Sequence, residues 1–449
     1  MDITADIGDF SGHAGPDACP GALQVHTAAD GALARVRIPG GALSPAQLRE
    51  LAACAAELGS GVIELTSRAN VQVRGLRAPD PADPSSVPAF AARMAAAGLL
   101  PSATHERVRN ILASPLAGRV PSSLADVRPL VSALDRALCG TPELAGLSGR
   151  FLFALDDGTG DVVSCGADVT FLATSASGGV LLLGGVRQGP PVDLAGVVPL
   201  MLAAASAFME LGDGGAWRVR DVQDGPALLA ARLFGAAQEE PGQSDQAGDS
   251  GPAGDSDPTG PADPADLARP ADLARPADPA RPADPAGPAG RERAGVRDAG
   301  TFRQLDGDVA LEVVIPLGRL TAHQAAVLAD AAPEARVTPW RTVVLPGLAP
   351  DAVQQVADRL TGAGLVTVPG TPWAGLSACT GRPGCAKSLA DVQLDARVWA
   401  ERPDHEPAAR PVHWAGCERR CGRPAGEVVD VVATPAGYRV AGRTEEEGT

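Results

Sequence analysis

Four cysteines near the C-terminus form the pattern with the clearest chemical meaning. Five residues separate Cys379 from Cys385, and three separate Cys417 from Cys421. Glycine and proline lie between them, so the backbone can curl around sulfide ions and offer them N–H groups, as an iron–sulfur cluster held by four thiolates requires. A structural zinc site, which usually has closer cysteine pairs, and a disulfide, which needs an oxidising compartment, remain the alternatives.

The elements that must position these thiols alternate between strands and helices. A strand is predicted at 32–38 and a helix from Ser44-Pro45-Ala46-Gln47, which has a capping side chain and a helix-starting proline, to Leu58. The segment 307–316 and the residues after Leu320 repeat this order, which indicates a duplicated module. A further helix at about 386–399 would point its N-terminus at an anionic cluster.

Composition limits the classes of function. The chain has 449 residues, enough for two or three domains, and a net charge of −16, which argues against nucleic acid or an anionic membrane as a general partner. The acidic N-terminus and the absence of 18 uninterrupted apolar residues predict a cytoplasmic protein. Because Lys387 is the only lysine, arginines must bind any anionic ligand.

The cysteine motifs resemble the cluster-binding signature of the nitrite and sulfite reductase family. The resemblance implies that Cys379, Cys385, Cys417 and Cys421 hold a [4Fe-4S] cluster, and that Cys421 bridges to a sirohaem iron where one is bound. It also implies an α+β fold with a pseudo-twofold axis, in which ferredoxin-like half-modules are duplicated and followed by reductase-type α/β domains.

The implied domains follow one another along the chain. They are a ferredoxin-like half-domain at 1–80, a reductase-type domain at 81–237, a second half-domain at 301–350 and a cluster-binding domain at 351–449. The segment 238–300 is rich in proline, alanine and aspartate and predicts a disordered linker.

Two further segments resemble those with which the family binds tetrapyrrole carboxylates and substrate. They are Thr66–Gln72 and Arg107–Ile111, which make Arg68 and Arg109 candidates, together with Arg74 just beyond the first segment. Arg150 is the remaining candidate. For a single arginine in an alternating strand, a solvated surface charge is the alternative.

One departure separates branches of the family. Where reductases have a basic-x-basic pair, only Arg150 is basic in the segment 149–153. This segment, the residues around Cys19 and the 417–422 ending resemble the precorrin-3B synthases of cobalamin biosynthesis. The resemblance implies an oxidoreductase of the monooxygenase type that uses O2, an electron donor, the cluster and an additional non-haem iron. Its substrate would be precorrin-3A, which is hydroxylated at C20 and closed to a γ-lactone.

Two other functions remain open: a sirohaem-dependent assimilatory sulfite or nitrite reductase, and a non-catalytic iron–sulfur or tetrapyrrole-binding protein. No histidine spacing identifies ligands of a second iron. The catalytic residues and the role of Cys19 are unassigned.

Overall fold

The structure is a computed structural model that describes residue 17 and residues 19–76, 86–211, 215–235, 296–402, 409–424 and 426–441. All of them belong to one unit of the chain. Most of the predicted 238–300 linker lies outside the described residues. Its last five residues are described, and there Ala299 is buried and Gly300 begins a strand, so the second half starts by residue 296.

The first half-module is a five-stranded antiparallel sheet, sheet A, covered by helices. Its strand order is β1-β2-β5-β4-β13. Helix α1 begins as its sequence predicts, because the Ser44 hydroxyl accepts the N–H of Gln47 while the Gln47 side chain accepts the N–H of Ser44. The elements are β1 (His26–Ala28), β2 (Gly31–Val36), η1 (Pro39–Gly41), β3 (Ala42–Leu43), α1 (Pro45–Leu58), β4 (Val62–Leu65), β5 (Val71–Leu76) and α2 (Ser86–Ala96).

The second half-module repeats this plan in sheet B, with the order β11-β12-β15-β14-β3. Thr321 and Gln324 form the same reciprocal cap at the start of α6. The elements are β11 (Gly300–Arg303), β12 (Val309–Val314), η5 (Pro316–Gly318), β13 (Arg319–Thr321), α6 (Ala322–Ala329), β14 (Ala335–Val337), β15 (Thr342–Leu348) and α7 (Val353–Gly362).

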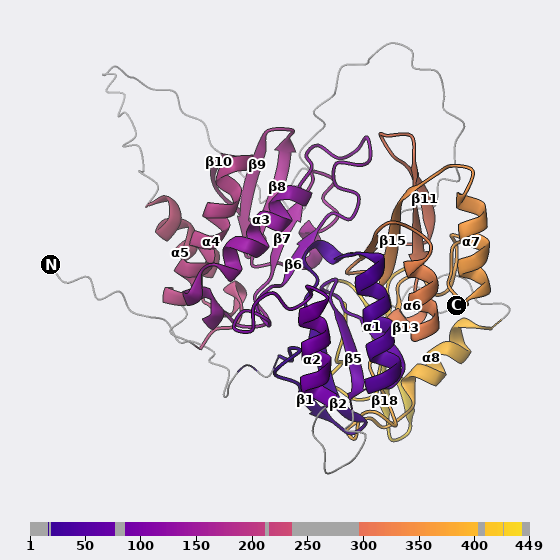
Figure 1. The fold of residues 1–449 in the computed structure, drawn as a ribbon. Coiled ribbons are helices and arrows are strands. Elements are labelled where there is room, and N and C mark those ends of the chain that lie inside the picture. Colours follow the sequence, from indigo (N-terminus) through magenta and orange to yellow (C-terminus); the bar gives the residue numbers. More distant parts are fainter. Residues whose placement is uncertain are drawn as a thin grey trace, which may run out of the picture. The chain divides into compact units, whose positions relative to one another are not determined.

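The two half-modules exchange their edge strands. Strand β13 of the second pairs with β4 of the first, and β3 of the first pairs with β14 of the second. At the crossing, a Cβ on Gly41 would lie 2.0 Å from the Val337 carbonyl oxygen, and its φ is +69°, so only glycine fits. Helices α1 and α6 pack together (Figure 1). One apolar core runs through both half-modules.

Two further sheets follow the half-modules and share one topology. Each has three parallel strands and then antiparallel pairing at one end. In sheet C these are β6 (Ile111–Ala113), β7 (Phe153–Asp156), β8 (Val169–Ser175), β9 (Gly178–Leu183) and β10 (Val186–Asp193). In sheet D they are β16 (Leu376–Ala378), β17 (Val412–Ala415), β18 (Val429–Thr434) and β19 (Gly437–Ala441).

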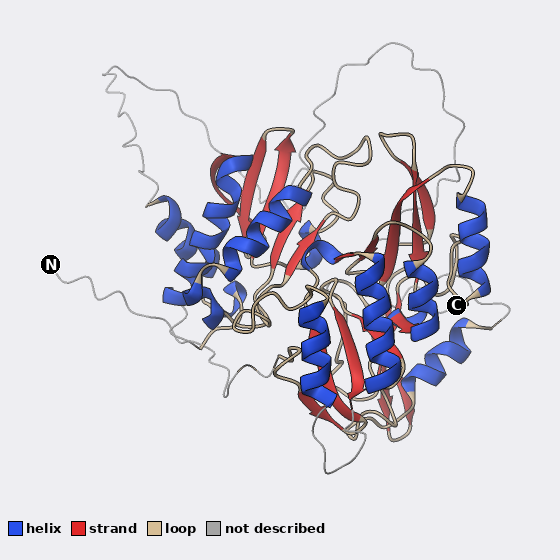
Figure 2. Cartoon of the chain, in the orientation of Figure 1, coloured by secondary structure: helices blue, strands red, loops and turns tan. Residues whose placement is uncertain are grey.

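Helices cover both of these sheets (Figure 2). Sheet C has α3 (Arg128–Cys139), α4 (Leu194–Leu211) and α5 (Gly225–Phe234), with short 3-10 turns η2 (Pro142–Gly146), η3 (Val163–Cys165) and η4 (Val219–Asp221), and sheet D has α8 (Val392–Ala400). By length and composition alone α4 could cross a membrane, but its buried residues belong to the core beside sheet C.

The shared core makes a stability prediction. Leu328 on α6 is buried in it, so Leu328→Ala should lower the free energy of unfolding by about 2–5 kcal/mol through lost burial and a cavity. Leu305→Ala is the matched control because Leu305 is 65% exposed, and it should change stability little. Urea denaturation of both variants measures the difference, and equal effects would contradict a core shared by the half-modules.

Candidate functional site

Parallel pairing in sheet D brings the two cysteine motifs together. Cys379 directly follows β16, and Cys417 lies two residues after β17. Ala378 pairs with Trp414 in the register of these strands, so both motif loops leave the sheet at the same edge. This places Cys379 and Cys385 beside Cys417 and Cys421, which lie at least 32 residues later in the chain.

Backbone hydrogen bonds interlock the two loops. The Gly416 N–H donates to Cys379 Sγ at 3.2 Å, and the Leu389 N–H donates to the Gly416 carbonyl at 2.8 Å. A side chain at Gly416 would place its Cβ 1.9 Å from Ser388 Oγ, so the loops can approach this closely only with glycine there.

The four thiols match the number of ligands that a cubane cluster needs. All eight cysteines are free, and among the described residues no three of these four sulfurs lie within 4.8 Å of one another. Thiolates around one zinc ion lie about 3.8 Å apart, given Zn–S bonds of about 2.3 Å. A cubane cluster spreads its thiolates over four irons, so Cys379, Cys385, Cys417 and Cys421 would each bind one.

Burial raises the pKa of Cys379, and the nearby Cys421 and Cys385 thiols raise it further. Burial, followed by Cys417, raises the pKa of Cys421 in the same way. Thiolates are therefore unfavourable here without a cation, and a bound iron centre would supply that positive charge.

The helix expected beside Cys385 begins later than predicted. Helix α8 starts at Val392, where the Asp391 side chain accepts the Leu394 N–H. The segment between them is held as turns, because Leu389 bonds to Gly416 and the Ser388 hydroxyl donates to the Ala390 carbonyl. The predicted start at 386 was therefore wrong, but the first turn of α8 still packs on the first motif loop, where Gln393 Nε2 donates to the Cys379 carbonyl at 2.6 Å. A helix dipole directed at a cluster stays a prediction.

A buried histidine lies under the second motif. His413 Nδ1 is 2.9 Å from Ser377 Oγ, while its Nε2 has no hydrogen-bond partner among the described residues, and the ring faces Gly422. Burial, and then the Arg341 charge, lowers the pKa of His413 to about 3. The sequence did not single it out, because one histidine in a strand has no ligand spacing to recognise.

A cavity of about 600 Å³ adjoins the cluster loops and is lined by both half-modules. Cys379 and Cys421 are in its wall. Its positive charge comes from seven arginines: Arg35, Arg68, Arg74, Arg150, Arg319, Arg341 and Arg423. Such a wall suits a ligand with several carboxylates.

Of the predicted arginines, Arg68, Arg74 and Arg150 line this cavity. Arg68 donates to the Gly149 carbonyl at 3.4 Å, and no carboxylate in the described part of the chain pairs with it. Burial, and then the Arg218 charge, lowers the pKa of Arg68 to about 9. An anionic ligand beside it would stabilise the charged guanidinium. Arg74 instead binds Asp30 with two hydrogen bonds and donates to Gly384 O at 3.2 Å, which fastens the first cysteine loop to sheet A.

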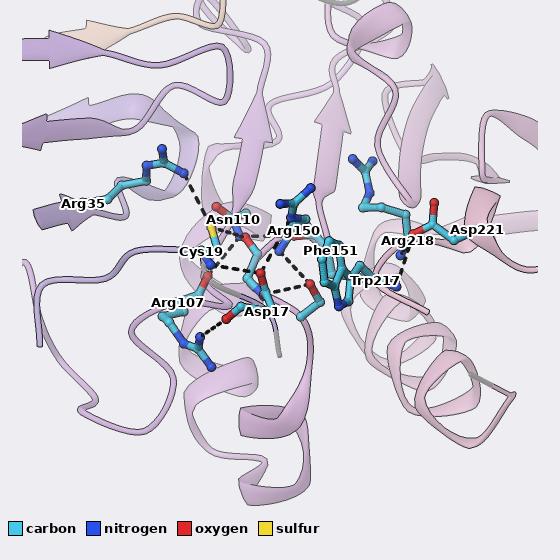
Figure 3. Close-up of polar contacts among 12 residues, drawn as sticks. Asp17, Cys19, Arg35, Arg107, Asn110, Arg150, Phe151, Trp217, Arg218 and Asp221 are labelled. Atoms are coloured by element: carbon cyan, nitrogen blue, oxygen red, sulfur yellow. Dashed lines mark hydrogen bonds and ion pairs between the residues drawn. The ribbon is translucent and has the colours of Figure 1, made fainter. Parts of the chain in front are cut away.

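Arg150 is partly engaged by neighbours (Figure 3). Its guanidinium stacks 4.3 Å from the Trp217 ring centroid and lies 3.7 Å from an Asp17 oxygen. Asp17 also accepts the Gly149 N–H at 2.7 Å, so the segment is fixed in place. Arg150, the basic side chain of this segment, therefore lines the cavity while it also contacts Trp217 and Asp17.

Arg109 does not line the cavity, contrary to the prediction. Its guanidinium makes two hydrogen bonds to Asp135, at 2.7 and 2.8 Å, and a third to the Leu99 carbonyl. It is buried between α3 and the first half-module, where it has a structural role. The neighbouring Asn110 supports the site indirectly by donating to the Gly149 carbonyl at 2.9 Å.

The other four cavity arginines were missed. Arg35 faces the cavity from β2, and β-strand alternation with Gln72 could have indicated it. Arg319 arrives on the exchanged strand β13. Arg341, at φ +62° in the turn equivalent to the one that carries Arg68, donates to the Gly422 carbonyl at 2.5 Å. Arg423 follows the second motif. Contacts over long stretches of chain place Arg319 and Arg341, whereas Arg423 lies two residues after Cys421 and its position next to the motif could have indicated it.

Cys19, which had no assigned role, also lies in the cavity wall. Its sulfur is 3.3 Å from Arg37 Nη2 and 3.5 Å from Arg35 Nη1, and it donates to the Gly149 carbonyl.

The equivalent face of sheet B is filled. Leu116 and Val120 pack on Ala310 and Val344 there. Arg297 pairs with Glu312 at 2.8 Å and stacks 4.7 Å from the Trp340 centroid.

Sheet C, in turn, has acidic residues where sheet D has cysteines. Asp156 ends β7, Asp157 follows it, and both form a group with Asp161. These carboxylates already accept bonds from backbone N–H groups, hydroxyls and Arg297. One half of the duplication therefore keeps an open site.

Comparison with known proteins agrees with this geometry. The model of the nitrite/sulfite reductase ferredoxin-like half domain matches residues 26–83 and 302–363. Each half-module of the chain is thus similar to that half domain. The second match extends past our boundary at 350 and includes α7.

Several relatives cover most of the chain. A precorrin-3B synthase of Sinorhizobium sp is 26% identical over 433 residues, 94% of this chain and 81% of that protein. The chloroplastic ferredoxin–nitrite reductase of Arabidopsis thaliana is 24% identical, over 87% of this chain and 65% of its own length. The NirA structure from Mycobacterium tuberculosis has the same fold, with a TM-score of 0.64 and 21% identity over 91% of this chain and 74% of NirA. These relatives of the chain are oxidoreductases.

The cysteine assignment predicts the effect of one substitution. Cys385→Ser should remove bound iron and sulfide and destabilise the sheet D domain, because cluster binding contributes to folding there. Cys139→Ser is the control, since Cys139 lies at the end of α3 and should leave both contents unchanged. Iron and sulfide analysis of anaerobically purified protein tests this, and full occupancy in Cys385→Ser would refute the ligand assignment.

The corrected role of Arg109 also has a test. Arg109→Leu should cost about 3 kcal/mol of stability, because it leaves Asp135 unpaired in a largely buried place. Arg49→Leu breaks an exposed arginine–aspartate pair and should cost less than about 1 kcal/mol. Denaturation curves compare them. A stable Arg109→Leu protein that no longer binds tetrapyrrole would restore the ligand-binding role.

Proposed function

We propose that the chain is a precorrin-3B synthase-like oxidoreductase of aerobic cobalamin biosynthesis. It hydroxylates precorrin-3A at C20 with O2 and closes a γ-lactone. The observation that carries the proposal is the arginine-lined cavity beside Cys379 and Cys421. The match to a precorrin-3B synthase over 94% of the chain supports it.

The charge distribution supports a polycarboxylate substrate. Seven guanidinium groups face one cavity in a protein whose net charge is −16, so anions are attracted to this place and repelled elsewhere. Arg68, without a carboxylate partner in the described part of the chain, and Arg341, beside the second motif, are suited to bind substrate carboxylates and fix the ring relative to the cluster.

The 149–153 segment, in contrast, has little provision for a small oxyanion. Arg150 is the basic side chain of the 149–153 segment, and Trp217 and Asp17 already engage it. Donors that stabilise charge on a reacting oxyanion must be free and close to it. This favours the synthase over a sulfite or nitrite reductase.

The proposed reaction needs an electron donor and iron. One oxygen atom of O2 enters the product and the other leaves as water, which takes up two electrons and two protons. The [4Fe-4S] cluster, held by the four motif cysteines, would supply electron transfer, and an additional non-haem iron would supply oxygen activation. The chain's own residues would bind and orient the macrocycle.

The competing function is a sirohaem-dependent reductase. It is favoured by the 36% identity to a ferredoxin–nitrite reductase of Synechococcus elongatus, which extends over 132 residues, 28% of this chain and 25% of that protein. In that case Cys421 would bridge the cluster to the sirohaem iron.

An absorption spectrum with iron and sulfide analysis, on protein purified without oxygen, separates these functions. We expect at least about four irons and four sulfides per chain and no strong sirohaem band. Turnover of precorrin-3A under ¹⁸O₂ should then add one labelled atom to the C20 hydroxyl. A sirohaem band with reduction of sulfite or nitrite would overturn the proposal, and binding without turnover would indicate a non-catalytic protein.

A further inference from the structure

A row of four polar side chains crosses the floor of the cavity. Arg35, Gln72, Glu64 and Arg319 stand on β2, β5, β4 and β13, and each is the register partner of the next. Because cross-strand partners point to the same face of a sheet, all four face the cavity together. The exchanged strand β13 completes the row with Arg319.

Glu64 differs from the other charged residues of the cavity because it is acidic. It is the one carboxylate among the cavity-lining residues in the described part of the chain, where seven arginines also stand. A second hollow of about 420 Å³, lined by Asp30 and Asp391 as well as by arginines, shares Arg74 and Arg319 with the cavity. A carboxylate here opposes the binding of a polyanion, so it needs a ligand group that it can attract.

One oxygen of Glu64 is held and the other is available. Gln72 Nε2 donates to Oε2 at 2.6 Å, and Arg35 in turn donates to Gln72 Oε1, which fixes the orientation of that amide. Oε1 makes no hydrogen bond among the described residues, and its nearest cation, Arg319 Nε, is 3.9 Å away. The side chain is largely buried, so water competes weakly for Oε1.

A tetrapyrrole offers two kinds of group to such a floor. Its periphery carries carboxylates, which the arginines suit, and a metal-free ring also presents pyrrolic N–H donors at its centre. An iron complex has lost those N–H groups to the metal. A carboxylate at the floor can therefore accept from the metal-free ring and has nothing to accept from the iron complex.

We propose that Glu64 is a specificity residue that accepts the inner N–H groups of a metal-free tetrapyrrole and so selects it over the iron-containing ring. This rests on the proposed function, because it assumes that the cavity binds a tetrapyrrole. The cavity arginines bind the carboxylates at the periphery of either ring. Glu64 supplies the difference between them.

The test uses two rings with the same periphery: metal-free sirohydrochlorin and its iron complex, sirohaem. Binding is followed by absorbance titration of the cluster-loaded, full-length protein without oxygen. The unchanged protein should bind sirohydrochlorin at least about tenfold more tightly. Glu64→Gln should lose most of that preference by weakening sirohydrochlorin binding about tenfold, as expected for loss of a charge-assisted hydrogen bond, while sirohaem binding stays within about twofold.

Glu57→Gln is the matched control, because Glu57 lies on the exposed side of α1 and should change neither affinity. If Glu64→Gln misfolds by its melting curve and iron content, Glu64→Asp, which keeps the charge, should fold and retain the preference. The ratio of the two affinities in the unchanged protein is a second measurement, and it does not depend on any variant.

Each outcome bears on a different claim. Equal affinity of the unchanged protein for both rings, or equal weakening of both by Glu64→Gln, would overturn the role of Glu64 and leave the tetrapyrrole cavity standing. Failure to bind either ring would refute the proposed function itself, and the inference with it.

Discussion

The exchange of edge strands between the half-modules is the constraint on which the rest of the structure depends. Neither sheet A nor sheet B is complete without a strand from the other half. A relative movement of the halves would break backbone ladders and expose the core around α1 and α6, so the geometry between them is fixed. The cavity can then be shared by side chains from both halves, as a preorganised site requires.

The cluster loops are attached to this frame at specific points. Arg74 on sheet A binds the Gly384 carbonyl, and Arg341 of the second half binds the Gly422 carbonyl. Each motif is thus tied to one half-module by an arginine that also lines the cavity. The positions of both cysteine loops relative to the cavity are consequently fixed by side chains of its wall.

Duplication has been followed by divergence. On sheet A the polar row of Arg35, Gln72 and Glu64 is open, while the register-equivalent residues of sheet B are Glu312, Val344 and Arg336. Apolar packing by Leu116 and Val120 covers that face. In sheet B only Val344 of these three is apolar, and Glu312 is paired with Arg297, so this face is packed while the sheet A row lines an open cavity.

The sequence alone determined those features that depend on residue type and short spacing. The Ser44 cap and the duplication could be predicted, because caps and hydrophobic periodicity act within a few residues. The cysteine spacing also predicted a common site, and the structure brings the two motif loops together, while the ligand assignment stays a prediction. The family resemblance supplied Arg68, Arg74 and Arg150, which line the cavity, and also Arg109, which does not. A motif identifies a basic residue but not the carboxylate, here Asp135, that neutralises it.

The tertiary structure alone decided what depends on pairing between distant segments. The strand exchange brings Arg319 beside Glu64, although 254 residues lie between them in the sequence. The turn at Arg341, the buried His413 and the late start of α8 likewise follow from contacts with other loops. Register and long-range packing are cooperative properties of the whole fold, and no local pattern encodes them.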